Sequence, residues 1–245
     1  MDPIEQFKQE VESNIKKLSN DRDVQALSRI WIREIANYKY AYNFSWMGRP
    51  LIQFPQDMIA MQEIIWRLQP DLIIETGIAH GGSLIYYASL LELIGNDGEV
   101  VGIDVDIREH NRKEIESHKM YKRITMIEGS STDPEIINEV NRLAAEKQCV
   151  LVILDSNHTH EHVLAELKLY SPLVTKGSYL VVFDTLVEDM PEELSSNRPW
   201  GKGNNPKTAV REFMMTNDRF VIDKEMESKL LITVAPDGYL KCIKE

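Results

Sequence analysis

The stretch from Asp71 to Ser83, DLIIETGIAHGGS, most constrains what this chain can fold into. Its short apolar run ends in Glu75 and passes into a Gly-rich turn before a mostly apolar segment opens at Ser83. This order predicts a buried strand, a turn and the start of a helix. Glycine lets a ligand approach the backbone, a helix start offers free N–H groups, and an acid at a strand end accepts hydrogen bonds from hydroxyl or ammonium groups. The stretch is therefore typical of a nucleotide-binding turn.

The glycine spacing narrows the class of nucleotide. The turn has neither the G-x-G-x-x-G spacing of dinucleotide-binding folds nor the G-x-x-x-x-G-K-[ST] lysine of nucleoside triphosphate sites. Both of those patterns hold phosphate groups against backbone N–H groups. A ligand without a pyrophosphate is favoured over a dinucleotide or a nucleoside triphosphate.

From Asp71 onward, apolar runs alternate with segments of helical periodicity. Strands are predicted at 72–75, 100–104, 124–128, 150–155 and 178–184, and helices at 83–94, 108–118, 133–146 and 160–173. This alternation predicts an α/β fold with a doubly wound, mostly parallel sheet. A helix at 207–215 and late strands at 220–223 and 230–234 follow, before a turn at 237–238. We expect the late strands to pair antiparallel at a sheet edge.

The residues before Asp71 form a separate segment. Apolar positions at helical spacing over residues 3–37, broken at 19–21, predict a helical N-terminal extension, and 56–68 predicts a further helix. The aromatic stretch 38–55 is expected to be a lid over the Gly-rich turn, a surface for a second subunit, or a packing loop. The length suits one large α/β domain. We expect an extension with a lid or packing segment over residues 1–69 and the main α/β domain over 70–245.

The extension also raises the question of oligomeric state. Its helices carry Phe7, Val11, Ile15, Ile30 and Trp31 outside the layers that the sheet and its own helices complete. Apolar surface of this kind needs a partner, and a homo-oligomer would supply it. The alternative is that these helices fold back on their own domain.

Charge and cysteine content exclude some partners and sites. A net charge of −11 argues against nucleic acid or an acidic membrane surface, because binding to polyanions needs clustered Lys and Arg. Cys149 and Cys242 are expected to be buried thiols rather than a disulfide framework or a metal site. The sequence shows no apolar leader and no window that approaches a membrane span, so the expected location is cytoplasmic.

Acids stand at the ends of all five predicted parallel strands. A single acid there is most often a helix cap, but ligands of an open α/β sheet bind beyond the carboxyl ends of the strands, so a full set indicates a site. Asp104, after the second strand, suits the hydroxyls of a ribose. The five ends carry Glu75, Asp104 followed by Asp106, Glu128 followed by Asp133, Asp155 and Asp184.

Asp155 and Asp184 lie toward the other side of the predicted sheet. Two carboxylates there could hold a divalent cation such as Mg²⁺, which prefers oxygen ligands, or could be two independent caps. His158 follows three residues after Asp155 and is our candidate general base; a helix cap is the alternative role. A zinc site using His158 and His162 lacks the H-E-x-x-H pattern, and His160 and His162 are expected at the surface.

Together these motifs resemble those of S-adenosylmethionine-dependent methyltransferases. Within that class they are similar to the cephalosporin hydroxylase family, which also contains rhamnosyl O-methyltransferases. The resemblance covers about residues 46–213 and rests on five segments of the sequence, ETGIAHGGS, VVGIDVDI, IEGSSTD, LDSNHTHEHVLAEL and RPWGKGNNPKTAV.

The resemblance implies a class I methyltransferase fold and a set of site residues. Glu75, Gly77 and the turn at 81–83 would approach the methionine part of S-adenosylmethionine, and Ser130, Ser131 and Asp133 would lie near its adenine. Similar sugar O-methyltransferases hold a divalent metal with an Asp after the fourth strand and a Glu-Asp pair after the fifth. Asp155 and Asp184 match, whereas Phe183 replaces the Glu. The expected cofactor-binding residues are Glu75, Gly77, Gly81, Gly82, Ser83, Asp104, Ser130, Ser131, Asp133 and Asp155; the catalytic residues are His158 and Asp155; and the metal ligands are Asp155 and Asp184.

Three functions follow from these residues. The first is an O-methyltransferase that acts on a hydroxyl of a sugar or glycosylated small metabolite, with Mg²⁺ as an assisting cation. In that function the loop 198–206, which contains Trp200, is expected to close over the acceptor. The second is an oxygen-dependent hydroxylase with iron on Asp155, His158 and His160. The third is a non-catalytic nucleotide-binding protein that lost its metal through Phe183.

Overall fold

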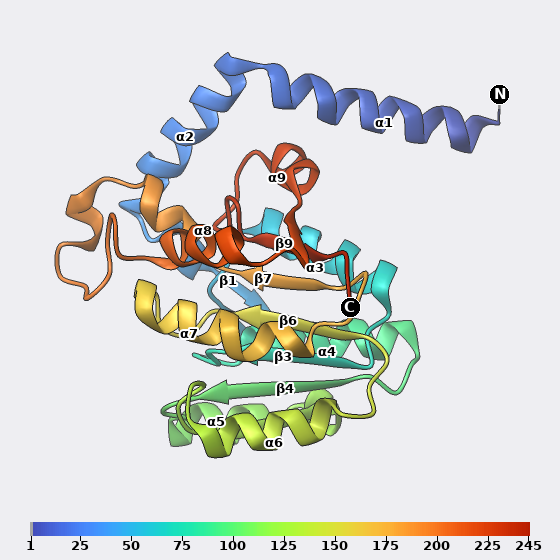
Figure 1. Ribbon diagram of the computed structural model, residues 1–245, viewed down its shortest axis with the longest axis vertical. Helices are drawn as coiled ribbons and strands as arrows, with labels where there is room; N and C mark the ends of the chain where they lie inside the picture. Colours follow the sequence, from blue (N-terminus) through green and yellow to red (C-terminus); the bar gives the residue numbers. More distant parts are fainter. Residues whose placement is uncertain (1) are drawn as a thin grey trace.

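The computed structural model describes residues 2–245, and its central feature is a seven-stranded sheet of order β5-β4-β3-β6-β7-β9-β8 (Figure 1). Neighbouring strands from β5 through β7 pair in parallel, whereas β9 runs antiparallel to both β7 and β8. This mostly parallel α/β sheet with an antiparallel edge confirms the predicted fold class. The strands are β3 (Leu72–Thr76), β4 (Glu99–Asp104), β5 (Ile124–Glu128), β6 (Val150–Leu154), β7 (Tyr179–Val182), β8 (Phe220–Ile222) and β9 (Tyr239–Cys242).

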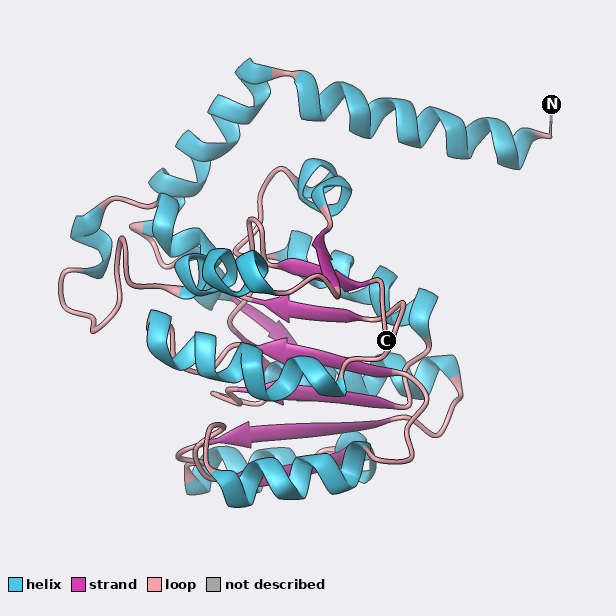
Figure 2. Cartoon of the chain, in the orientation of Figure 1, coloured by secondary structure: helices cyan, strands magenta, loops and turns pink. Residues whose placement is uncertain are grey.

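Helices cover both faces of the sheet, as Figures 1 and 2 show. One apolar core joins the sheet to α3, α4 and α5, and a second joins it to α6, α7 and α8. Successive residues of β3 enter opposite cores, so both faces of this central strand are buried. The helices are α3 (Pro55–Leu68), α4 (Gly82–Ile94), α5 (Glu109–Glu116), α6 (Pro134–Ala144), α7 (His160–Tyr170) and α8 (Pro206–Thr216).

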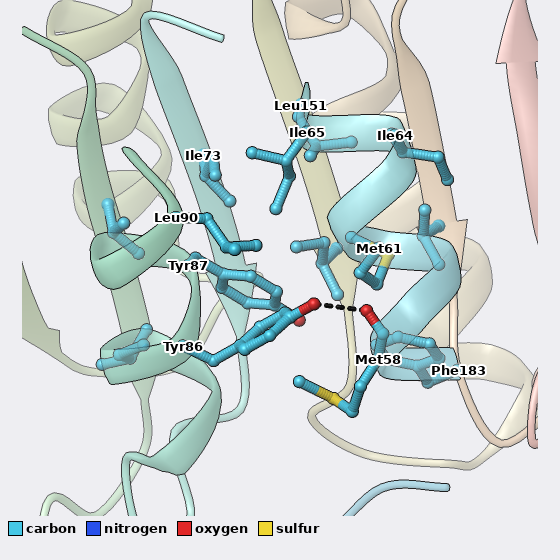
Figure 3. Packing of buried hydrophobic residues seen from close by; sticks show 14 of the residues in the cluster. Met58, Met61, Ile64, Ile65, Ile73, Tyr86, Tyr87, Leu90, Leu151 and Phe183 are labelled. Carbon is cyan, nitrogen blue, oxygen red and sulfur yellow. Dashed lines mark hydrogen bonds between the residues drawn. The ribbon is translucent and has the colours of Figure 1, made fainter. Parts of the chain in front are cut away.

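Aromatic and aliphatic side chains of α3 and α4 interlock in the first core (Figure 3). Tyr86 and Tyr87 of α4 are almost fully buried, and Met61 of α3 is completely so. The Tyr86 hydroxyl donates to the carbonyl oxygen of Met58, which satisfies a polar group that this core would otherwise leave unpaired. Phe183, directly after β7, packs into the same core.

The N-terminal extension consists of α1 (Pro3–Asn20) and α2 (Arg22–Ala36), and Asp21 caps the second helix. Figure 1 shows α1 above the layered body, where it contacts α9 (Lys224–Leu230). No residue of α1 is buried, and Phe7 is 67% exposed. Among residues 2–245, no helix has the length and apolarity that a bilayer crossing would require.

The aromatic segment after α2 packs against its own domain. It forms the 3₁₀ turn η1 (Tyr40–Asn43) and a hairpin of β1 (Phe44–Trp46) and β2 (Arg49–Leu51), which lies against α4. The indole Nε1 of Trp46 donates to Ser89 Oγ of α4 over 3.0 Å. A Cβ on Gly82 would overlap the carbonyl oxygen of Pro50. The segment therefore holds the N-terminal end of α4, which is the end that faces the strand ends.

The predicted strand at 230–234 is wrong. Leu230 ends α9, and the residues after it form a loop that the buried carboxylate of Asp57 holds in place. Asp57 accepts hydrogen bonds from Thr233 Oγ1 (2.5 Å) and from the Val234 N–H (2.9 Å). These bonds satisfy the loop without a neighbouring strand, and the second late strand is β9 instead.

The two cysteines are free thiols, as predicted, although they differ in burial. Cys242 on β9 is fully buried, whereas Cys149, just before β6, is half-buried. Its Sγ donates to the carbonyl oxygen of Leu68 over 3.7 Å. Cys242 belongs to the second apolar core, whereas Cys149 is part of neither core.

We expect Gly82→Ala to lower the free energy of unfolding by about 1–3 kcal/mol, because the added methyl group must displace the backbone at Pro50. Urea unfolding of the variant and the parent measures the difference. Leu93→Ala, on an exposed position of the same helix, is the control and should stay within about 0.5 kcal/mol of the parent. An unchanged midpoint for Gly82→Ala would show that β2 can move away from α4.

Candidate active site

A cavity of about 430 Å³ lies at the carboxyl ends of β3, β4, β5 and β6. This is the edge where ligands of open α/β sheets bind. Residues at the ends of four predicted strands line the cavity, together with residues from the loop after β7. Its walls include Gly77, Asp104, Ser130, Ser131, His158 and Trp200.

Glycine is required in the turn after β3 for reasons of packing. Gly77 has φ +91°, and a Cβ on it would overlap the backbone carbonyl of Asp155. Gly81 has φ +77° as the N-cap of α4, where a Cβ would meet the side chain of Ile115. Gly77 lines the cavity, whereas Gly81 and Gly82 lie outside its lining and serve the junction of turn, helix and hairpin.

Glu75 is buried beneath this turn at 1% exposure. Its Oε2 accepts a 2.6 Å hydrogen bond from the hydroxyl of Ser83, while its buried Oε1 has no hydrogen-bond partner among the described residues. Burial raises the pKa of Glu75 to about 8, although the bond from Ser83 opposes that rise. A ligand that brings a positively charged donor would satisfy Oε1 and favour the carboxylate.

Asp104 orders the same turn from the end of β4. Its Oδ2 accepts hydrogen bonds from the backbone N–H groups of Ile78 (2.8 Å) and Ala79 (3.2 Å), and its Oδ1 accepts one from Asp106 (3.1 Å). A carboxylate has about four acceptor positions, so Asp104 can still bind hydroxyl groups in the cavity that it lines.

The acids and hydroxyls after β5 separate into two roles. Ser130 and Ser131 line the cavity. Asp133 is exposed and accepts a 2.8 Å hydrogen bond from the backbone N–H of Glu135, so it caps α6 and does not line the cavity. The structure thus gives Asp133 the cap role that an isolated acid at a strand end usually has.

Asp155, His158 and Asp184 converge beside the cavity. Each offers one ligand atom, and these atoms lie within 4.8 Å of one another; His158 Nε2 and Asp184 Oδ2 are 3.1 Å apart. Burial, followed by the charges of Asp184 and Glu75, raises the pKa of Asp155 well above its usual range. A divalent cation would relieve this repulsion, and the oxygen-rich donor set suits a hard ion. The residues present therefore fit a Mg²⁺ site.

The neighbouring position, where the resemblance implies a Glu, does not reach this group. Phe183 is 1% exposed and packs in the core with Met58 and Met61, as Figure 3 shows. Asp184 directly follows it and has a left-handed backbone with φ +54°. The change in backbone direction puts one residue in the core and the next in the site.

The loop after β7 brings an aromatic side chain over His158. The rings of Trp200 and His158 meet edge to face with 4.9 Å between their centroids, and the guanidinium of Arg198 lies 5.0 Å from the Trp200 ring. Glu188 holds the loop through hydrogen bonds from the Gly203 N–H (2.8 Å) and from Asn205 Nδ2 (2.5 Å). These contacts hold the loop next to His158, the candidate general base.

His160 lies outside the group of Asp155, His158 and Asp184, which we call the cation group. Its Nδ1 is 2.8 Å from Thr208 Oγ1 and its Nε2 is 3.1 Å from Glu212 Oε2, both on α8. The set of Asp155, His158 and His160 that an iron hydroxylase would use therefore does not come together.

His162 was expected at the surface, and this expectation is wrong. It lines the cavity, and its Nε2 is 3.0 Å from Ser131 Oγ and 3.2 Å from Ser156 Oγ. Ser156 also donates to Oε1 of the fully buried Glu166 over 2.7 Å. The Nε2 atom of His162 faces both hydroxyls and also the Glu166 carboxylate. His162, Ser131, Ser156 and Glu166 therefore form a polar wall of the cavity. Their arrangement is neither that of a nucleophilic triad nor that of a zinc site. The four-residue spacing of His162 and Glu166 was the only sequence signal for it.

Gln53, on the segment between β2 and α3, also reaches the site. It is 5% exposed, and its Nε2 donates to Asp155 Oδ2 over 3.3 Å. Sequence analysis did not find it, because a single glutamine so far from Asp155 in the chain carries no local signal.

The raised pKa of Glu75 predicts a pH-dependent stability. Between its ordinary value of 4.5 and about 8, the folded chain holds a proton that the unfolded chain has released. The free energy of unfolding should therefore fall as pH rises through this interval. We expect Glu75→Gln to be more stable than the parent at pH 9 and to lose that advantage at pH 5, measured by urea unfolding without ligands. Glu146→Gln, at an exposed carboxyl, is the control; a pH-independent difference for Glu75→Gln would contradict the shift.

Comparison with known proteins places the chain in a family. The model of the family Rhamnosyl O-methyltransferase/CmcI matches residues 38–243. Rhamnosyl O-methyltransferases of Mycobacterium tuberculosis and Mycobacterium bovis are each 36% identical to the chain over 200 residues, which is 80% of this chain and 77% of the relative.

Solved structures of CmcI share the fold. Two of them, an apo structure and one described with Mg and SAM, are each 19% identical to the chain, cover 83% of it and 78% of the solved chain, and give a TM-score of 0.59. The chain therefore belongs to the Rhamnosyl O-methyltransferase/CmcI family and is an S-adenosylmethionine-dependent O-methyltransferase.

Proposed function

We propose that the chain methylates a hydroxyl group of a sugar or of a glycosylated small molecule, with a divalent cation, Mg²⁺, at the site of Asp155 and Asp184. The observation that carries the proposal is the convergence of Asp155, His158 and Asp184 beside the cavity at the strand ends. The sugar acceptor is supported by the rhamnosyl O-methyltransferases that the chain resembles, and the cation by the CmcI structure described with Mg and SAM.

The residues around the cavity fit S-adenosylmethionine, which supplies a methyl group already activated on a sulfonium. Glu75 offers its buried, unpartnered Oε1 to the ammonium group of the methionine part. Asp104 has acceptor positions for the ribose hydroxyls, while Ser130 and Ser131 form the part of the wall for the adenine. Gly77 supports this arrangement by letting the turn pass against Asp155.

His158 is the general base of this proposal. Asp184 lies 3.1 Å from its Nε2, and the Trp200 ring covers another side of the imidazole, so the ring is held in one orientation. Sugar hydroxyls are poor nucleophiles until they lose a proton, and His158 would take it. A cation on Asp155 and Asp184 would supply Lewis acidity, which lowers the pKa of a bound hydroxyl.

Trp200 is the acceptor-facing part of the loop after β7. It lies in the wall of the cavity next to His158, and the Arg198 guanidinium packs over its ring. An aromatic face suits the apolar C–H face of a sugar ring, and a sugar placed there would have its hydroxyls near the base. Trp200 thereby orients the acceptor, while Glu188 keeps the loop attached.

The chain also acts as a homo-oligomer in this proposal. The apolar side chains of α1 and α2 continue along both helices and stay exposed: Ile4 at 66%, Phe7 at 67% and Leu27 at 64%. Figure 1 shows α1 reaching past the layered body, so its outer face is open to a second copy. Burial of this face in a second copy would remove it from water.

The cation site predicts that methyl transfer can be lost without a loss of cofactor binding. Asp184→Ala should abolish methyl transfer and leave cofactor affinity nearly intact, and EDTA should reproduce this in the parent. Mass spectrometry of a panel of sugars and glycosides, scored for a gain of one methyl, measures the activity. Glu128→Gln, at an exposed acid on the end of β5, is the control and should keep parent activity. Activity that persists in EDTA would remove the cation from the mechanism.

His158→Ala should lower the rate by about 10²–10⁴-fold, as expected for the loss of a general base. Its affinity for the cation should stay at the parent value, because the base does not hold the metal. A loss of metal binding in this variant would instead make His158 a ligand. Unchanged activity in both His158→Ala and Asp184→Ala would show that the site lies elsewhere.

The oligomer prediction concerns Phe7 on the exposed face of α1. Light scattering should report a multiple of the chain mass for the parent at micromolar concentration, and Phe7→Glu should shift it toward the monomer while circular dichroism still reports the parent's helix content. Gln9→Glu, at an exposed position two residues away, introduces the same change in charge and should leave the oligomer intact. A monomeric parent would contradict the proposal.

A further inference from the structure

Gln53 reaches the cation group from outside the sheet. It lies between β2 and α3, and its backbone is fixed on both sides because Leu51 and Phe54 are buried and Pro55 begins α3. The side chain itself is 5% exposed. Its amide is thus held at the side of Asp155 by the fold rather than placed there by a flexible loop.

The amide of Gln53 is only half satisfied. Nε2 donates to Asp155 Oδ2 over 3.3 Å, whereas the buried Oε1 has no hydrogen-bond partner among the described residues. Buried carbonyl oxygens are normally paired, so an unpaired one beside Asp155 is available to a group that completes the site. Because Oε1 and Nε2 share one carbon atom, this oxygen lies at the edge of the group formed by Asp155, His158 and Asp184.

The cation group lacks an oxygen that the amide can supply. Asp155 and Asp184 provide carboxylates, while Phe183 is turned into the core and provides nothing. Amide carbonyl oxygens are among the oxygen ligands that hard cations accept. The terminal torsion of a glutamine is soft, so the amide can turn its oxygen toward the ion without moving the backbone. A neutral third ligand also leaves two carboxylate charges to balance a divalent ion.

We propose that Oε1 of Gln53 is the third protein oxygen ligand of the divalent cation that Asp155 and Asp184 hold. The inference rests on the cation of the proposed function and adds a residue to its site. It makes the segment between β2 and α3 part of the active site, so that ligands come from the strand ends and from this segment. The alternative partner for Oε1 is an N–H or O–H group of bound S-adenosylmethionine.

Binding of Mn²⁺, a paramagnetic substitute for Mg²⁺, tests this on the full-length protein. Electron paramagnetic resonance follows free Mn²⁺ during a titration, and calorimetry with S-adenosylhomocysteine measures the nucleotide site separately. Gln53→Leu should weaken Mn²⁺ binding by about tenfold, in the range seen when residues that support metal sites are replaced. Its affinity for S-adenosylhomocysteine should stay at the parent value. Gln53→Glu, which supplies a carboxylate of the same length, should bind Mn²⁺ more tightly than the parent.

Gln56→Leu is the matched control. Gln56 lies three residues further along. Among the described residues its buried Oε1 also has no hydrogen-bond partner, but its side chain makes no hydrogen bond with Asp155. This variant should bind Mn²⁺ as the parent does. A loss in Gln53→Leu that Gln56→Leu shares would reflect general damage to the segment and would overturn the assignment.

The remaining outcomes separate this inference from the proposed function. Equal Mn²⁺ affinity for parent and Gln53→Leu would overturn the role of Gln53 while the cation site stands. A loss of S-adenosylhomocysteine affinity with Mn²⁺ affinity unchanged would overturn it in favour of the methyl donor. Should Gln53→Leu fail to fold, weaker Mn²⁺ binding in Gln53→Glu would overturn it. Asp184→Ala should bind no Mn²⁺. A parent protein that also binds none would overturn the cation site itself.

Discussion

The contact on which the active site depends is the passage of Gly77 against the backbone of Asp155. A side chain on Gly77 would overlap the Asp155 carbonyl, so the ends of β3 and β6 can meet only through glycine at this point. The N–H of Asp155 also donates to the carbonyl oxygen of Thr76 over 2.9 Å. In the proposed function the turn after β3 carries the nucleotide side of the cavity and Asp155 carries the cation side, so this one contact would set the distance between them.

The sequence predicted the layered fold because its signals were local. A strand such as Ile124–Glu128 is a short apolar run between polar turns, and the observed β5 has the predicted bounds. The error at 230–234 has the opposite cause: the apolar residues there are held by Asp57, which lies about 175 residues earlier and whose role no local pattern shows. Long-range hydrogen bonds to a buried carboxylate therefore determine that this segment is a loop and not a strand.

The candidate site likewise combines features with a local sequence signal and features that depend on long-range contacts. Strand-end acids were found because the carboxyl ends of parallel strands share one edge, and Asp155 and Asp184 do converge there. The sequence could not show which acids point inward: Asp133 caps a helix in solvent, whereas Glu75 is buried. It also could not show His162 or Gln53, since each acts through partners brought close only by tertiary packing.

The junction of Phe183 and Asp184 limits how this site can change by substitution. Position 183 is enclosed by apolar side chains of α3, and the left-handed backbone at 184 turns the chain toward the cavity only after it. A carboxylate introduced at 183 would enter a hydrocarbon environment, where an unpaired charge is strongly unfavourable. In this chain, substitutions that add a ligand to the proposed cation site would therefore be accommodated more readily in the loops around the sheet than at the end of β7.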